Sequence, residues 1–536
     1  MKTRRSVWLL GVIGIVLTSH AQNTVPALDP SKMPVVGQVD ERFQSYNIEM
    51  IEITGGRFWA PYKQDQTAPA DTAQATPGNI PASLYRYRAP IDLTNPNLRK
   101  LAAALGPAYI RVSGTWANST FFQDSDDPAP VNTGAPTDRS SSVGLKPPAG
   151  FNGILTRAQW RGVIDFAHAV NANLVTSFAV SQGVRDANGI WTPVEAEKVL
   201  KYTRSVGGSI AAAEFFNEPT FATLGGAPKG YDAAAYGRDF RAFHAYIKKA
   251  APEMKILGPG SIGEAHSFGS MPGIQLLHSE DMLQQQGPGL LDAFSYHFYG
   301  GLSQRCARMG MAGTTPEAAL SHDWFARTER DEAFYAALRD RFAPGKPIWL
   351  TETGETACGG DPWASSFIDS FRYLYQLGVL TRKGVQVVMH NTLNASDYAL
   401  IDESTLTPRP NYWSALLWRR LMGVKVLDPG PSSQLDVYIF AHCLRGKQRG
   451  VAILAINADR TNTHSLAIPA KSTRYTLAST DLLSSTVQLN GAELSLTSSG
   501  DLPAVSGIPQ SEGQVSLAPA SITFLAIPGA QNAACQ

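Results

Sequence analysis

Apolar residues follow two alternating patterns between residues 45 and 422. Short runs rich in β-branched and aromatic residues, typical of buried strands, alternate with stretches in which apolar residues recur every three or four positions, typical of amphipathic helices. Eight strands are expected, at 45–51, 108–114, 173–180, 209–217, 254–258, 290–299, 347–352 and 384–390. Helices are expected at 95–105, from 156, at 192–206, 232–250, 276–286, 323–341, 363–377 and 411–422.

This alternation predicts a parallel α/β architecture, and eight repeats predict closure into a (β/α)8 TIM barrel. The alternative is an open, doubly wound sheet, but no Gly-rich phosphate-binding loop opens any of these helices. Thr156 can cap the helix that follows it. Thr192-Pro-Val-Glu195 fits a capping box with proline at the first helical position.

The pattern changes after residue 423. Segments 436–440 and 450–456 are rich in β-branched residues, Asn490-Gly491 is typical of a hairpin turn, and 521–527 reads as a closing strand. We therefore expect a catalytic barrel at 22–423, with an extended N-terminal segment, followed by an antiparallel β-sandwich domain at 424–536.

The first 21 residues have the pattern of a cleaved export signal. A basic start precedes an apolar run at 7–17 that is too short to span a bilayer, and a small-residue exit follows at 19–21. We expect a periplasmic or extracellular protein. The 46 basic and 45 acidic residues leave a formal charge of +1, which gives no reason to expect nucleic acid or a membrane as partner. We expect a monomer.

Four cysteines follow the export signal, at Cys306, Cys358, Cys443 and Cys535. An even, small number in an exported protein predicts two disulfides, although three pairings are open. The ten histidines show no paired spacing next to carboxylates, so neither a metal nor another cofactor is expected. Asn118-Ser-Thr and Asn394-Ala-Ser fit the glycosylation sequon.

Two glutamates stand at the ends of predicted strands. Glu218 closes Ala213-Glu-Phe-Phe-Asn-Glu, and Glu352 lies where strand 347–352 enters a Gly-rich loop. Parallel barrels carry their chemistry at the carboxyl ends of their strands. Hydrolysis of a glycosidic bond needs one carboxylic acid and one carboxylate. Asn217 can offer its amide to a sugar hydroxyl, whereas Glu214 and Glu355 are expected in supporting positions.

Asn217-Glu218-Pro219, together with Trp349-Leu-Thr-Glu352-Thr, Gly359-Gly360 and segments 385–390 and 397–402, resembles the heparanase and β-glucuronidase family of retaining glycoside hydrolases. The similarity continues through both domains. It implies that Glu218 is the general acid/base and Glu352 the nucleophile, with carboxyl groups roughly 5–5.5 Å apart. Burial and the charge of Glu352 would then raise the pKa of Glu218.

The resemblance also assigns substrate contacts. His297 and Tyr299 match a His-x-Tyr motif whose tyrosine supports the nucleophile, and Tyr398 with the N–H groups near Gly359 matches a clamp on the uronic acid carboxylate. Thr115 and Glu49 resemble sugar-hydroxyl contacts, with Glu49 in place of the commoner aspartate.

The order of the barrel loops predicts one disulfide pairing, and the family resemblance implies the other. Cys358 stands where the family often has glycine. Cys306 follows the sixth predicted strand and Cys358 the seventh, and consecutive barrel loops are neighbours, so we predict a Cys306–Cys358 bridge at the rim of the cleft. Cys443 and Cys535 match the family's bridge in the sandwich domain.

Three functions are open within this picture. We expect an exported enzyme that removes terminal β-D-glucuronic acid from glycosides or uronic-acid-containing oligosaccharides by double displacement. An endo-acting enzyme on heparan sulfate is the alternative, but residues 261–304 contain no Lys or Arg, and 119–150 is short for an excised linker. A carbohydrate-binding protein on an inactive scaffold would typically have lost a catalytic carboxylate, and this chain keeps both.

Overall fold

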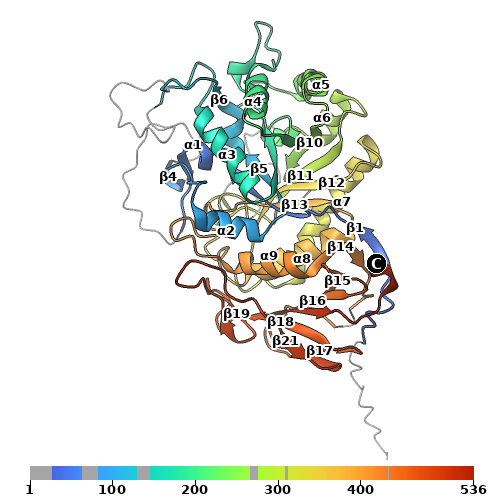
Figure 1. Cartoon of the computed structure of the whole chain (residues 1–536). Coiled ribbons are helices and arrows are strands. Elements are labelled where there is room, and N and C mark those ends of the chain that lie inside the picture. The colour runs from blue at the N-terminus through green and yellow to red at the C-terminus, as the bar shows by residue number, and fades with distance from the viewer. Residues whose placement is uncertain (1–26, 63–81, 129–144, 266–275, 308–311, 433) are drawn as a thin grey trace, which may run out of the picture.

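The computed structural model describes residues 27–62, 82–128, 145–265, 276–307, 312–432 and 434–536 (Figure 1). The expected export signal lies outside these ranges. No helix in the described part of the chain is long and apolar enough to cross a membrane.

Eight parallel strands close into a barrel, as the sequence predicts. In chain order they are β2 (Gln44–Glu49), β5 (Ala108–Ser113), β8 (Ala172–Ser177), β9 (Ile210–Glu214), β10 (Lys255–Ile262), β11 (Ala293–Tyr299), β12 (Ile348–Gly354) and β13 (Val387–His390). β13 pairs with β2 and closes the ring. The barrel interior holds its own small apolar core, built around Trp349 and Tyr109.

Helices cover the outside of the barrel. They are α2 (Pro96–Ala104), α3 (Arg157–Ala169), α4 (Val194–Ser205), α5 (Ala233–Ala250), α6 (Ser279–Gln286), α7 (His322–Phe342), α8 (Asp369–Arg382) and α9 (Pro410–Leu421). Thr156 caps α3 as predicted. Its hydroxyl oxygen accepts the main-chain N–H of Gln159, and the side-chain oxygen of Gln159 accepts the main-chain N–H of Thr156.

Two predictions about helix starts are wrong. The Thr192 capping box does not form, because the Thr192 hydroxyl bonds the carbonyl of Val184 and the Glu195 carboxylate accepts the N–H of Phe122 instead. The helix expected from 363 begins only at Asp369. The N–H groups of Phe367 and Ile368 instead donate to carbonyls of the C-terminal domain, a long-range contact that no local pattern reveals.

The C-terminal domain is built on an antiparallel sheet. Its strands are β14 (Met422–Leu427), β15 (Val437–Leu444), β16 (Val451–Asn457), β23 (Ser521–Ile527), β18 (Ser472–Ala478), β19 (Gln488–Leu489), β20 (Ala492–Glu493) and β21 (Ile508–Gln510), joined at the edge by the N-terminal β1 (Val35–Gln38). A second sheet, β17 (His464–Ile468) with β22 (Gly513–Leu517), completes an apolar core with the first. Asn490-Gly491 forms the predicted hairpin between β19 and β20.

Helices α8 and α9 lie between the barrel strands and this sheet (Figure 1). Gly378 of α8 sits directly against the Phe440 ring of β15, where a Cβ would come within 2.4 Å of that ring. Both predicted disulfides are present, Cys306–Cys358 between barrel loops and Cys443–Cys535 within the sandwich domain. The sandwich sheet thus packs against the helix layer formed by α8 and α9.

Candidate active site

The two strand-end glutamates lie next to each other. Glu218 follows β9 with a left-handed backbone (φ 47°), and Glu352 lies on β12. One oxygen of each carboxyl group and one ring nitrogen of His297 all lie within 4.8 Å of one another. Glu218 keeps 18% of its side chain exposed and Glu352 only 7%. This spacing suits a retaining mechanism, in which no water has to fit between the carboxylate and the sugar.

Both oxygens of Glu352 are held by donors. Tyr299, at the end of β11, donates its hydroxyl to Oε1 over 2.8 Å, and Nη1 of Arg111 donates to Oε2 over 2.8 Å. Hydrogen bonds to a charged acceptor are the stronger kind, and one of these donors is itself a cation. The two bonds therefore fix the orientation of the Glu352 carboxylate.

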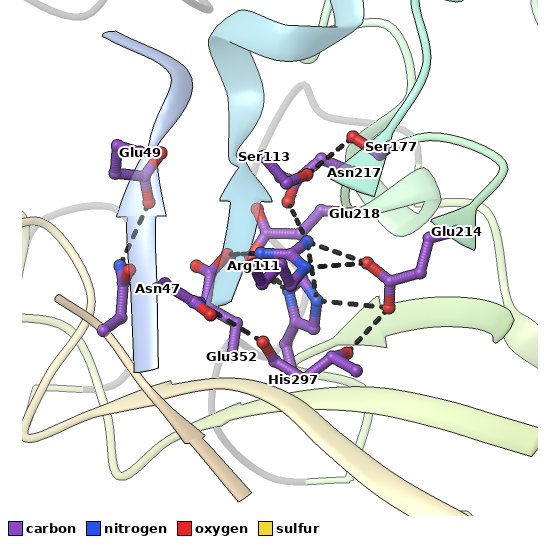
Figure 2. A network of polar contacts seen from close by, with 12 residues as sticks. Asn47, Glu49, Arg111, Ser113, Ser177, Glu214, Asn217, Glu218, His297 and Glu352 are labelled. Atoms are coloured by element: carbon purple, nitrogen blue, oxygen red, sulfur yellow. Dashed lines mark hydrogen bonds and ion pairs between the residues drawn. The ribbon is translucent and has the colours of Figure 1, made fainter. Parts of the chain in front are cut away.

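Arg111 is the centre of this network, and the sequence analysis missed it. The side chain, 1% exposed, reaches from β5 to Glu214 with Nε (3.0 Å) and Nη2 (2.8 Å), and to Oδ1 of Asn217 with Nη2 (2.7 Å). Figure 2 shows the guanidinium lying between Glu214 and Glu352. The available signal was an arginine inside a strand that is otherwise apolar and buried, because such a charge needs partners.

Glu214 is the deeper carboxylate that its offset from Glu218 predicts. It is fully buried and accepts hydroxyl bonds from Ser295 (2.8 Å) and Thr351 (2.7 Å) besides those from Arg111. Burial opposes its ionisation, but the charge of Arg111, the hydrogen bond and charge of His297 and the bond from Thr351 together outweigh burial and hold the pKa of Glu214 well below its usual range. Gly260 leaves room for it, since a Cβ there would meet its Oε1 at 2.8 Å. Glu214 is thus a fixed counter-charge for Arg111.

His297 lies between the carboxylates. Its Nδ1 is 3.2 Å from Oε1 of Glu218, and its Nε2 is 3.7 Å from Oε1 of Glu214. Burial disfavours the imidazolium, but the charge of Glu352 and the bonds to Glu214 and Glu218 outweigh burial and raise the pKa of His297 to about 9. The ring is therefore cationic at neutral pH and donates to Glu218.

The pKa of Glu218 is shifted in the direction that a general acid needs. Burial, joined by the negative charge of Glu352, raises its pKa despite the opposing contact with His297. Its neighbour Asn217 is held by Asn118, whose side chain bonds both the N–H (2.8 Å) and the carbonyl (2.9 Å) of Asn217. The left-handed turn at Glu218 is thus anchored on both sides of the Asn217 peptide.

Comparison with known proteins agrees with this geometry. The family model described as "Glycosyl hydrolase family 79, N-terminal domain" matches residues 87–378, a little more than half of the 536-residue chain. The chain belongs to glycosyl hydrolase family 79. Its activity is therefore glycoside hydrolysis, and the resemblance to heparanases and β-glucuronidases is confirmed.

Two relatives and one solved structure show how much of this chain is similar to known proteins. Heparanase of Mus musculus is 29% identical over 490 residues, covering 83% of this chain and 88% of its own. The Baicalin-beta-D-glucuronidase of Scutellaria baicalensis is 34% identical over 190 residues, 34% of this chain and 36% of its own. A Fusarium oxysporum 4-O-alpha-L-rhamnosyl-beta-D-glucuronidase structure shares the fold, with a TM-score of 0.59, 12% identity, and coverage of 94% and 99% of the two chains.

The remaining predicted contacts of this family 79 chain lie around the glutamate pair. Tyr398 is buried, with its ring 6.2 Å from that of Tyr299. Gly360 packs on Tyr398, since a Cβ there would lie 3.2 Å from the Tyr398 nitrogen. Gly359 (φ 85°) packs on Trp59, where a Cβ would come within 2.6 Å. The Gly359–Gly360 turn is thus packed against Trp59 and Tyr398, and the Tyr398 ring neighbours the Tyr299 that donates to Glu352.

Glu49 and Thr115 lie at the ends of β2 and β5, and β2 is the barrel neighbour of β13. The Glu49 carboxylate packs against Gly114, where a Cβ would come within 1.6 Å of Oε2. Burial, together with the charges of Glu352 and Glu52, raises the pKa of Glu49 well above its usual value. Thr115 is half-buried and starts a 3-10 turn directly after Gly114.

Cys358 has φ 66°, a left-handed conformation that glycine adopts readily, which fits the glycine that the resemblance implies at this position. The same rim holds Arg305. It is one of two arginines that follow segment 261–304, which has no Lys or Arg, and the other, Arg308, lies outside the described residues. Nη2 of Arg305 is 3.4 Å from Asp397, and its guanidinium stacks 3.7 Å from the centre of the Tyr62 ring. Arg305 is thus an already paired cation.

Neither sequon asparagine is accessible in the folded chain. Asn118 is fully buried under Asn217, and Asn394 is 6% exposed.

A cation is a poor fit to the cluster of Glu218, His297 and Glu352, although those three residues are close enough to share one. His297 carries a positive charge at neutral pH, and Arg111 already donates to Glu352. These two cationic groups lie next to the atoms that would bind a metal ion, and their charges would repel it.

Proposed function

We propose that this chain is an exported, retaining β-glucuronidase that removes terminal β-D-glucuronic acid. The observation that carries the proposal is the position of Tyr398, whose ring lies 6.2 Å from that of the Tyr299 that donates to Glu352, with Gly360 packed against it. Backbone N–H groups and a tyrosine hydroxyl are neutral donors suited to a sugar carboxylate. A name that includes β-D-glucuronidase among the relatives gives independent support.

The mechanism follows from the protonation states. Glu352 attacks the anomeric carbon while Glu218 gives its proton to the departing oxygen, which forms a covalent glycosyl-enzyme. Glycosylation removes the charge of Glu352, one of the causes that raise the pKa of Glu218. Glu218 can then accept a proton from water, which attacks the anomeric carbon and frees the sugar with its configuration retained.

The contacts of Arg305 favour exo-cleavage of glucuronides over cleavage within heparan sulfate. A sulfated polymer needs unpaired cations along the cleft. Arg305 is committed to Asp397 and Tyr62, and the segment 261–304 before it has no Lys or Arg. The inactive-scaffold reading is disfavoured because both carboxylates are present, adjacent and supplied with donors.

A substrate panel tests the proposal. Aryl β-glucuronide, β-glucoside, β-galacturonide and a heparan sulfate oligosaccharide are offered to wild type, to Glu352→Gln, and to Glu253→Gln, a control at a largely exposed glutamate. Wild type and the control should release the aglycone from the glucuronide, while Glu352→Gln loses at least about 10⁴-fold in kcat because no nucleophile remains. Internal shortening of heparan sulfate without action on the aryl glucuronide would contradict the proposal.

A further inference from the structure

Asn391 lies directly after β13, the barrel strand next to the one that carries Glu352. It is 1% exposed, and its N–H donates to the carbonyl of Thr353 over 2.7 Å. The main chain of Asn391 is therefore fixed to the backbone one residue beyond Glu352. No motif or resemblance in the sequence assigns it a role.

The Asn391 amide reaches three oxygens of the active site. Nδ2 lies 2.9 Å from the Tyr299 hydroxyl, 3.1 Å from Oε1 of Glu49 and 3.2 Å from the Tyr398 hydroxyl. An amide nitrogen has two hydrogens, so the three acceptors share them. Gly354 permits this convergence, since a Cβ there would meet the Tyr299 ring at 2.8 Å and the Tyr398 ring at 3.1 Å.

The Tyr299 hydroxyl has one hydrogen to give, and both the Glu352 carboxylate and the Asn391 amide lie within hydrogen-bond distance of it. It gives that hydrogen to Glu352 only if the Asn391 amide does not accept it. Because Asn391 presents N–H groups to the Tyr299 oxygen, it occupies a lone pair there and leaves the hydrogen for Glu352.

We propose that Asn391 is a positioning residue for the nucleophile. Its amide holds Tyr299 as a donor to Glu352 and links that donor to Glu49 and Tyr398 on the sugar side of the cleft. The inference rests on the proposed function in taking Glu352 as the nucleophile, but it holds for any β-glycoside that the chain cleaves. Burial raises the pKa values of Tyr299 and Tyr398 well above the usual value, so both keep the hydrogens that this arrangement directs.

The opposite amide orientation is the rival arrangement. With Oδ1 toward the cluster, Tyr398 and a protonated Glu49 would donate to it, and an acceptor at this position would serve equally well. Oδ1 is buried without a hydrogen-bond partner among the described residues. Asn391→Asp separates the two arrangements, because aspartate has the same shape and no N–H.

The first measurement is the pH profile of kcat/KM on the aryl β-glycoside that wild type cleaves best. In Asn391→Asp the carboxylate takes the Tyr299 hydrogen and adds negative charge near Glu352. We expect the acid limb to move up by about one pH unit and the maximum kcat to fall about 10- to 100-fold, the value of one hydrogen bond to a charged group. Asn391→Ala should lower kcat similarly with a smaller displacement of the limb.

Asn394→Ala, in the same loop but directed at the carbonyls of Ile401 and Asp402, is the control. It should keep the wild-type profile. A loss in Asn391→Asp that is equal at every pH, as misfolding would cause, overturns the proposal. So does a wild-type profile in that variant, which the rival orientation predicts.

A second measurement needs no substrate. His297 lies 3.8 Å from Oε2 of Glu352, so its ring resonance in histidine-labelled protein senses protonation of that carboxylate. In Asn391→Asp this perturbation should appear at higher pH than in wild type. An unchanged titration would refute the role of Asn391 even if the chain cleaved no glucuronide, whereas inactivity of wild type on the whole panel refutes the proposed function alone.

Discussion

Single residues decide the protonation pattern of this site, and His297 is the clearest case. Its imidazolium lies between Glu218 and Glu352 and lowers the pKa of Glu218 through a hydrogen bond. In His297→Gln both glutamates lose a neighbouring cation. We expect both limbs of the bell-shaped kcat/KM profile to move to higher pH, by about one unit each.

His168 is exposed, so His168→Gln serves as the control and should leave the pH profile unchanged. Limbs that stay in place in His297→Gln, with only the maximum lowered, would show that the ring is not charged in the working range.

The sequence indicates those site residues that end strands. Glu218, Glu352, His297 and Tyr299 each follow or close an apolar run, and the structure brings these four together. Arg111 and Asn391 were missed because their importance depends on which strands become neighbours. Closure of the barrel places Arg111 beside Glu214, 103 positions along the chain. No local pattern carries that information.

At the scale of elements, the sheet of the sandwich domain is joined to the barrel by a buried histidine. His442 of β15 is 1% exposed, and its Nδ1 donates to the carbonyl of Gly423 over 2.6 Å, while Nε2 lies 3.3 Å from the Thr381 hydroxyl of α8. Burial lowers its pKa to about 4. The unfolded chain therefore takes up a proton near pH 6.5 that the folded chain refuses until about pH 4.

Stability should accordingly fall as pH drops through this window, with His442 contributing up to about 3 kcal/mol. Thermal unfolding between pH 7 and 4 measures it. His442→Gln should flatten the dependence, and His168→Gln should retain it. Parallel curves for wild type and His442→Gln would contradict the assignment.

Element types were predictable and some boundaries were not. All eight barrel strands occur where apolar runs predict them, since burial on both faces leaves a clear composition. The start of α8 was misplaced because Phe367 and Ile368 bond to the sandwich domain. Likewise β1, from the segment expected to belong to the barrel, pairs with β14 of the sandwich sheet. Both differences arise from contacts between distant parts of the chain.

For the whole molecule, the Cys443–Cys535 bridge ties the C-terminus to β15 and closes a sequence separation of 92 residues. Replacing both cysteines by serine should lower the free energy of unfolding by up to about 4–5 kcal/mol, because the unfolded chain gains freedom. Chemical denaturation of the oxidised protein measures this. The bridge lies within the sandwich domain, whereas every catalytic group named above belongs to the barrel, so the double variant should keep its kcat below the unfolding transition. A loss of kcat with unchanged stability would contradict this account.

The central claim is that Glu352 forms a covalent bond to the sugar while Glu218 exchanges the proton. Trapping with a 2-deoxy-2-fluoro-β-glucuronyl fluoride, followed by mass spectrometry of the digested protein, tests it most directly. The account predicts one fluoroglucuronyl group per chain, on the peptide that carries Glu352, and none in Glu352→Gln. A label on any other residue, or turnover that releases the inverted sugar with no trapped intermediate, would contradict it.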